Sequence, residues 1–141
     1  SALEFGDWEN IYDVIVEPQL NNYVSFPFED ICIEWLRSKN KKRELPFIFT
    51  DIGRWWSKDI EIDIIATNED KSEILSAECK FHNSLINDSD LQKHLNKNIR
   101  SLKKKDNAVL HVWYFSWSGY TPEAREFAKK NNITLIDEND F

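Results

Sequence analysis

Apolar and polar positions alternate through the middle of the chain, which is the pattern of strands that bury one face. The alternation predicts strands over Phe47–Trp56, Asp59–Thr67 and Glu73–Lys80, with short polar turns between them. Strands joined by short turns pair with their neighbours, so this part of the chain is expected to form a three-stranded antiparallel meander.

Helical spacing of apolar residues flanks the meander on both sides. It occurs in Pro27–Ser38 and in Asn87–Lys105, and Thr121 is suited to cap a third helix. Further strands are predicted over Val109–Trp117 and Ile133–Ile136. The order helix, three strands, helix, strand, helix, strand predicts an α/β (α+β) fold with a mixed sheet, because a strand–helix–strand crossover joins parallel strands.

Length and composition favour one folded domain. The chain has 141 residues, of which 41% are hydrophobic and 30% charged, so it is long enough and apolar enough to bury a core. We expect a single domain over residues 25–141, preceded by an N-terminal extension over residues 1–24 that packs on it. The two cysteines lie in no zinc-like cluster, which favours a reducing compartment, the cytoplasm. No apolar run has the length of a membrane span, so we expect no membrane partner.

The net charge of −7 argues against a general nucleic-acid coat, because affinity for phosphates depends on Lys and Arg. It leaves a metal-dependent nuclease open, since a carboxylate cluster repels phosphate only until a cation binds it. An acidic balance is also ordinary for a soluble domain, and by itself it indicates no function.

Candidate chemistry lies on two of the predicted strands. In Glu78-Cys79-Lys80 the carboxylate and the lysine share one strand face, because side chains alternate. Asp63 lies on the polar face of the strand before. If the two strands pair, Asp63, Glu78 and Lys80 converge. The alternative is a salt bridge on a strand surface, which contributes little energy.

Set in this element order, these residues resemble the PD-(D/E)XK nuclease superfamily, whose restriction-endonuclease-like core has the order αβββαβ. The resemblance runs from about Phe26 to Ile136. The segments that carry it are Phe28-Glu29-Asp30, Glu61-Ile62-Asp63-Ile64 and Glu78-Cys79-Lys80.

A narrower resemblance is to the nuclease-like domain at the C-terminus of archaeal-type P-loop ATPases, a domain of uncertain activity. It is carried by Asp51-Ile52-Gly53-Arg54-Trp55-Trp56, by the site segments and by Ser116-Trp117-Ser118-Gly119-Tyr120-Thr121. This chain has no P-loop, so the resemblance implies an ATPase domain on the N-terminal side of a longer parent. No Gln-x-x-x-Tyr signature follows the third strand, so the exonuclease-type subgroup is not supported.

The superfamily resemblance implies a role for each site residue. Asp63 and Glu78 would bind Mg²⁺, or Mn²⁺, with the carbonyl of Cys79 as a further ligand. Lys80 would position the attacking water or stabilise charge on the phosphorus. Glu29 would bind a second metal ion or a metal-bound water; alternatively it lies at a helix start because it favours the helix dipole there.

Basic residues could contact nucleic acid at two places. Arg54, followed by two tryptophans, could grip a phosphate or stack on a base, or it could pack in the hairpin. The helix over Asn87–Lys105 is expected to turn Leu91, Leu95, Ile99 and Leu102 inward. Its basic residues share another face, which is either a nucleic-acid contact or a solvated surface: Lys93, Lys97, Arg100 and Lys104.

The sequence therefore leaves two candidate functions of different class. The first is a metal-dependent nuclease that hydrolyses phosphodiester bonds in nucleic acid, with DNA the expected substrate, and that serves an ATPase-containing parent. The second is a catalytically inactive domain of the same fold that docks on or regulates that ATPase. The Asp63, Glu78 and Lys80 set favours the first, and the acidic net charge favours the second.

Overall fold

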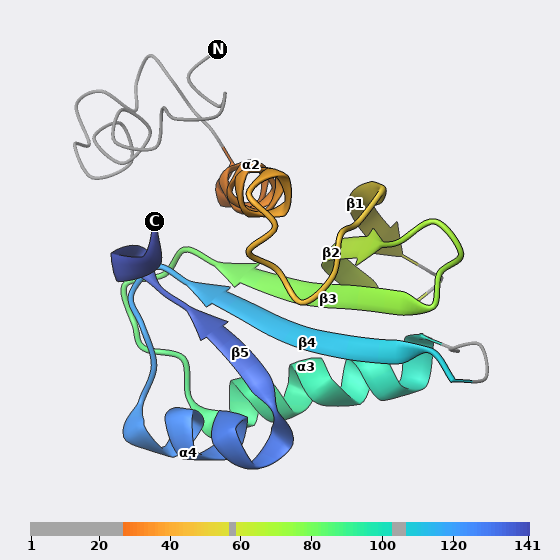
Figure 1. The fold of residues 1–141 in the computed structure, drawn as a ribbon. Coiled ribbons are helices and arrows are strands. Elements are labelled where there is room, and N and C mark those ends of the chain that lie inside the picture. The colour runs from red at the N-terminus through yellow and green to blue at the C-terminus, as the bar shows by residue number, and fades with distance from the viewer. Residues whose placement is uncertain (1–26, 57–58, 103–106) are drawn as a thin grey trace. The chain divides into compact units, whose positions relative to one another are not determined.

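The structure is a computed structural model that describes residues 27–56, 59–102 and 107–141 (Figure 1). The described residues fall into two compact units. One holds helix α2 (Phe28–Lys41) and the C-terminal Phe141, and the other runs from Phe49 to Asp140 and holds the sheet. No helix among the described residues is long and apolar enough to cross a membrane. The predicted N-terminal extension lies outside the described residues, and its boundary with the domain stays a prediction.

Five strands form one mixed sheet in the order β1-β2-β3-β4-β5 (Figure 1). The strands β1, β2 and β3 pair antiparallel, whereas β4 is parallel to β3 and β5 is parallel to β4. The predicted fold class, a mixed sheet with the element order αβββαβ, is confirmed. The strand bounds are Asp51–Trp56, Glu61–Thr67, Glu73–Lys80, Val109–Ser116 and Ile133–Ile136.

The alternation of side chains in β2 places the candidate chemistry. Ile62, Ile64 and Ala66 are buried on one face of the strand. The intervening residues, Asp63 among them, are half-buried or exposed and lie on the other face. A slip of one residue would exchange the two faces, so burial of the isoleucines fixes the direction of Asp63.

Helices α3 (Asp88–Ser101) and α4 (Pro122–Asn131) lie side by side along one face of the sheet (Figure 1). Asn87 begins α3 with a capping box, in which its side chain accepts the amide of Asp90 and the Asp90 carboxylate accepts the amide of Asn87. The hydrophobic part of this layer has eight buried residues: Ile86, Leu91, Val112, Tyr114, Tyr120, Ala124, Ala128 and Ile133.

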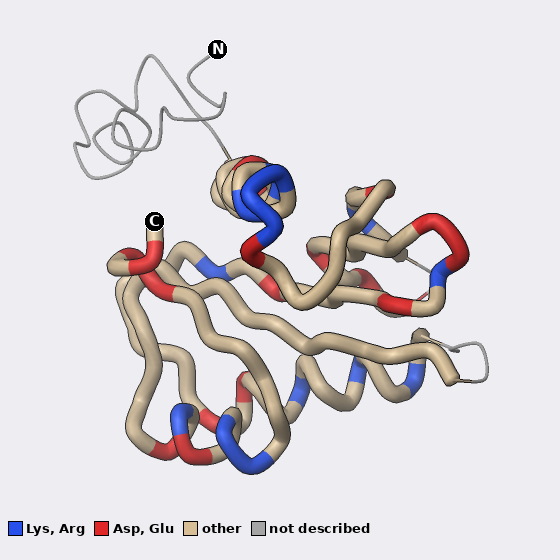
Figure 2. The backbone as a smooth tube through the Cα atoms, in the orientation of Figure 1, with Lys and Arg blue, Asp and Glu red and all other residues tan. Residues whose placement is uncertain are grey.

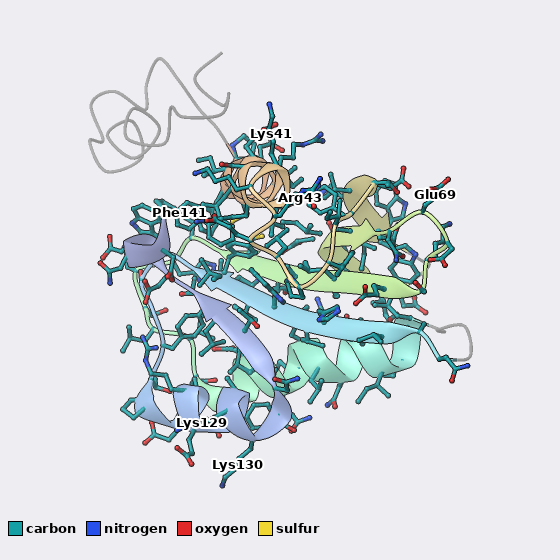
Figure 3. All side chains as sticks on the ribbon, viewed as in Figure 1. Lys41, Arg43, Glu69, Lys129, Lys130 and Phe141 are labelled. Atoms are coloured by element: carbon teal, nitrogen blue, oxygen red, sulfur yellow. The ribbon has the colours of Figure 1, made fainter. Side chains whose placement is uncertain are left out.

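The third helix is bounded as the sequence predicts. Thr121 caps α4 by accepting the amide of Ala124, and Pro122 occupies its first turn. Asn132 ends it in the left-handed conformation, at φ 56°, which asparagine tolerates better than most residues. Lys129 and Lys130 in the last turn project away from the helix (Figure 3), where their charges complement the helix dipole.

Some predicted bounds are wrong. The first strand begins at Asp51 rather than Phe47, because its partner β2 ends at Thr67, directly opposite Asp51. Before Asp51, the amide of Thr50 still donates to the Thr67 carbonyl at 2.9 Å. Helix α2 continues to Lys41, three residues beyond the predicted end. Helix α3 ends at Ser101, since Leu102 is extended. The predicted turn at residues 57–58 lies outside the described part of the chain.

The buried face of α3 also differs from the prediction. Ile99, expected inward, is 70% exposed. Leu91 is buried as predicted, but the buried residues that follow it are His94 and Asn98. The buried face of α3, at intervals of three and four residues, therefore includes two polar side chains. With the helix turned this way about its axis, Ile99 faces solvent.

The first unit holds α2, whose apolar stripe matches the prediction. Ile31, Cys32, Trp35 and Leu36 are buried. The ring of Phe141 lies 5.8 Å from that of Trp35 and 6.0 Å from that of Phe28, measured between centroids. Lys41 and Arg43 project from the end of the helix (Figure 3).

Candidate active site

The carboxylate of Asp63 lies against the backbone of the neighbouring strand. The paired register of β2 and β3 reaches Ile64 opposite Ala77, and one further step places Asp63 opposite Glu78. At this step Asp63 Oδ2 accepts the amide N–H of Cys79 at 3.0 Å. A side-chain carboxylate therefore takes the place of a backbone acceptor, and residues opposite each other in an antiparallel pair share a face. Asp63 and Glu78 consequently meet on one side of the sheet.

Glu78 is buried and held by two lysines. Its Oε2 is 3.7 Å from Lys80 Nζ, and Lys97 Nζ lies 3.3 Å from both of its oxygens. Lys80 stands two residues along the same strand and is therefore on the same face. Lys97 reaches the site from α3 and also donates to the carbonyl of Glu61 at 3.0 Å. Two strands and one helix thus contribute the charges of the site.

Burial and the nearby charges act on the pKa of Glu78 in opposite directions. Removal from water raises this pKa most strongly, and the negative charge of Asp63 raises it further. The ammonium groups of Lys97 and Lys80 lower it, and the balance leaves the pKa of Glu78 above its ordinary value. Two carboxylates that repel each other at one place are suited to a cation that binds both.

Polar residues lie under the site, between α3 and the sheet. His94 is buried and packs edge-on against Tyr114, with ring centroids 5.6 Å apart. Burial, assisted by the charge of Lys97, lowers the pKa of His94 to about 4, so the ring is neutral at physiological pH. The side-chain amide of Asn98 donates to the His94 carbonyl at 2.7 Å. Burial and the charge of Glu78 raise the pKa of Tyr114.

The donor set fits a hard divalent cation that keeps most of its water. Within the described residues, no group of three or more His, Cys, Asp and Glu side chains gathers to hold a metal ion. Mg²⁺ is commonly held by one or two carboxylates, with water and substrate phosphates as the other ligands. The N–H and C=O of one strand residue point to the same side, so the carbonyl of Cys79 faces the same edge as its amide, toward Asp63.

The other predicted site residues lie on other elements, at exposed positions, or outside the described residues. Glu29 is in the first turn of α2, within the first unit, and its role at the site stays a prediction. Arg54 is exposed on β1 and pairs with Glu61 at 3.7 Å. Basic positions recur along α3 (Figure 2), where Lys93 and Arg100 are exposed. Lys104 lies outside the described residues.

Sequence reasoning missed two features of the site. It assigned Lys97 to a nucleic-acid face, whereas its ammonium contacts Glu78; whether it also contacts nucleic acid stays a prediction. It did not identify His94 or Asn98 as buried. Their spacing of three and seven residues from Leu91 is a helical signal, but polar side chains do not enter a count of apolar positions.

Residues 1–100 match a protein family, DUF234, described as "Archaea bacterial proteins of unknown function". The chain belongs to this family. An uncharacterized protein of Methanocaldococcus jannaschii, MJECL04, is 32% identical over 142 residues, an alignment that covers 100% of this chain and 30% of that protein. The chain therefore spans less than a third of the length of this relative.

Solved structures are similar to this chain at low sequence identity. A protein of unknown function, AF1548, is 18% identical with a TM-score of 0.50, over 72% of this chain and 54% of that one. A repair endonuclease from Pyrococcus abyssi is 11% identical with a TM-score of 0.49, over 75% and 44%. EndoMS in its apo form is 9% identical with a TM-score of 0.45, over 81% and 47%. The likeness to AF1548 concerns the fold alone.

Proposed function

We propose that this domain is a metal-dependent nuclease that hydrolyses phosphodiester bonds, with Asp63 and Glu78 as metal ligands and DNA as the nucleic acid. The observation that carries the proposal is the meeting of two carboxylates and a lysine on one sheet face. Asp63 is hydrogen-bonded to the amide of Cys79, next to Glu78, and Lys80 is 3.7 Å from Glu78. Two adjacent carboxylates repel each other, and a cation bound between them would relieve this repulsion.

Each residue has a distinct task in this proposal. A bound Mg²⁺ or Mn²⁺ would polarise a phosphodiester oxygen and lower the pKa of a bound water. The hydrogen bond from Cys79 fixes Asp63 Oδ2 and orients the carboxylate between the strands. Lys80 is half-buried on the same face, where its ammonium can position the attacking water or stabilise charge that forms on the phosphorus. Glu29 as a ligand of a second metal ion belongs to the same proposal.

The longer relative supports the further proposal that this domain is part of a longer parent chain. That the domain is cytoplasmic and serves an ATPase in this parent is proposed from the resemblance of its sequence to the nuclease-like domain of archaeal-type P-loop ATPases. The second candidate function is an inactive domain of this fold that docks on that ATPase. The ion pairs of Lys97 with both oxygens of Glu78 favour the second candidate, since they balance the carboxylate without any metal ion.

Titration calorimetry with Mg²⁺ and Mn²⁺ tests the metal site without knowledge of the substrate. Asp63→Ala is expected to abolish binding, because it removes one of two carboxylate ligands. Glu69→Ala is the matched control, since Glu69 lies in the exposed turn between β2 and β3 (Figure 3) and should bind as the unaltered chain does. Equal binding by Asp63→Ala and the unaltered chain would reject the site.

Cleavage assays then separate the two functions. Lys80→Ala should bind the metal normally but lower the rate of hydrolysis about 100-fold or more, because the lysine acts on charge that develops in the transition state. Lys129→Ala, an exposed lysine in the last turn of α4 (Figure 3), is the control. The substrates are single- and double-stranded DNA and RNA at low salt. Normal metal binding without cleavage of any of them would select the docking function.

A further inference from the structure

A groove of about 510 Å³ opens beside β1, and its lining does not include the residues assigned to metal binding. We call it the β1 groove; the lining residues that matter here are Gly53, Arg54, Trp55, Ile65, Lys71 and Ile74. Ile65 alternates with Asp63 along β2, and Ile74 alternates with Glu78 along β3. The β1 groove therefore lies on the sheet face that carries the two carboxylates.

The groove begins close to the candidate metal site. Ile65 is two residues from Asp63, and an antiparallel strand rises about 3.4 Å per residue, so the two side chains are about 7 Å apart along β2. This is comparable to the step from one phosphate to the next along a nucleic-acid strand. A nucleotide in the groove can therefore be covalently connected to a phosphodiester at Asp63.

Gly53 keeps the groove open. It pairs with Ile65, and a Cβ atom built on it would meet no atom within 4 Å. Its φ lies outside the left-handed region, so the backbone does not require glycine here. Glycine in a strand interior weakens the strand, and it often marks a place where a ligand approaches closely.

The charges and the ring at the groove suit a nucleotide. Arg54 and Lys71 supply two cations, and Trp55 also lines the groove, beyond a register shift of β1 between Gly53 and Trp55 that breaks the strict alternation of faces. Asp51 also lines the groove and accepts the Thr50 hydroxyl at 3.1 Å, so its carboxylate can accept a further N–H from a base. A volume of this size lies within the range of sites for small ligands.

We propose that the β1 groove binds one unpaired nucleotide of a single-stranded nucleic acid. That the adjacent phosphodiester is the one cleaved rests on the proposed function; binding in the groove does not. A base within a duplex is already stacked on its neighbours, and its faces are unavailable to Trp55 until it leaves the stack. Arg54 and Lys71 hold the backbone on either side, and the base occupies the space above Gly53.

The test is fluorescence anisotropy with short single-stranded DNA and RNA oligonucleotides and with a matched duplex, in the presence of EDTA. Gly53→Phe fills the groove from a position that has room for a side chain. It should weaken single-strand binding about tenfold or more, which is the loss expected when one base no longer stacks. Thr134→Phe places the same bulk at an exposed position on the opposite edge strand, β5, and should bind as the unaltered chain does.

Two further variants separate this proposal from the nuclease proposal. Arg54→Gln should lower the affinity and reduce the salt dependence by about one phosphate contact. Asp63→Ala should bind the oligonucleotide at least as well as the unaltered chain, since it removes a negative charge outside the groove. If calorimetry finds no metal site but Gly53→Phe still weakens binding, the nuclease proposal falls and this one stands.

Three results would overturn the groove proposal. They are the absence of single-strand binding by the unaltered chain, equal affinity for the matched duplex, and unchanged binding by Gly53→Phe. The thermal unfolding midpoint of each variant is measured alongside, so that loss of binding through unfolding is recognised. If Gly53→Phe does not fold, Gly53→Leu replaces it.

Discussion

Replacing Lys97 by methionine separates the ion pair at the site from the packing of α3. Methionine keeps most of the unbranched apolar stem and removes the ammonium, which lies 3.3 Å from both oxygens of Glu78. Lys80, at 3.7 Å, is then the remaining partner of a buried carboxylate that also faces Asp63. The pKa of Glu78 should rise further, and the folded state should lose stability at pH 8.

The size of the loss follows from distance and burial. Two unit charges 3.3 Å apart attract by about 5 kcal/mol at an effective dielectric of about 20. The side chains are 29% exposed for Lys97 and 11% for Glu78, so the desolvation of both offsets part of this attraction. We expect Lys97→Met to lower the free energy of unfolding by about 1–3 kcal/mol, measured by chemical denaturation.

The same variant makes the candidate metal site easier to fill. A divalent cation about 4 Å from an ammonium is repelled by about 2 kcal/mol even at the dielectric of water. Without Lys97, Mg²⁺ should therefore bind about tenfold more tightly or better, and it should raise the unfolding temperature more than in the unaltered chain. Lys93→Met is the control, because Lys93 is exposed one turn earlier on α3. An equal Mg²⁺ response in Lys97→Met and the unaltered chain would refute this reasoning.

Three further predictions concern the support of the site. Burial lowers the pKa of His94 from 6.5 to about 4. As the pH falls, the unfolded chain therefore takes up a proton on this ring before the folded chain does. The free energy of unfolding should decrease by about 3 kcal/mol between pH 6.5 and pH 4. His94→Gln should lose less free energy of unfolding between pH 7 and pH 5 than the unaltered chain, as measured by chemical denaturation. The raised pKa of Glu78 acts in the opposite direction, but Glu78 is present in the variant and in the unaltered chain. Equal losses in the two chains would contradict the lowered pKa of His94. Asn87→Ala removes the side-chain half of the capping box of α3 and should cost about 1 kcal/mol, whereas an unchanged denaturation midpoint would mean that the cap is not formed in solution. Tyr120→Phe removes a hydroxyl that donates to the Tyr114 carbonyl at 2.8 Å and the Ile136 carbonyl at 2.7 Å, and it should cost about 1 kcal/mol. An unchanged denaturation midpoint would contradict the role of this hydroxyl.

The pattern of apolar and polar residues predicted the bounds of those strands that end at residues next to them in the sequence. Strand β3 and strand β5 have the predicted bounds because turn residues or a helix cap end them. The start of β1 could not be predicted in the same way, since it depends on where β2 ends across the hairpin. Pairing is a property of two segments, and alternation describes only one.

The site was predictable where it depends on strand faces and not where it depends on the helix. Alternation brings Asp63, Glu78 and Lys80 to one face once β2 and β3 pair. Whether Lys97 reaches the site depends on which face α3 turns to the sheet. A count of apolar residues placed Ile99 on that face, whereas Ile99 is exposed. The observed rotation buries His94 and Asn98 instead, and their polar partners come from the helix backbone and from the sheet. The partners in the sheet, Ser76 and Trp113, are distant from His94 in sequence, so periodicity alone contains no signal for them.

The charges of the site explain how an acidic domain could act on an anionic substrate. Asp63 and Glu78 are balanced by Lys80 and Lys97, so this part of the fold is close to neutral without a cation. On the proposed function, a divalent cation added to this balanced set leaves a local excess of positive charge. The excess arises only where the carboxylates meet, although the whole chain carries −7. Attraction of a phosphodiester then depends on the metal ion, and nucleic-acid binding near Asp63 should strengthen when Mg²⁺ is added, whereas binding in the β1 groove should persist in its absence.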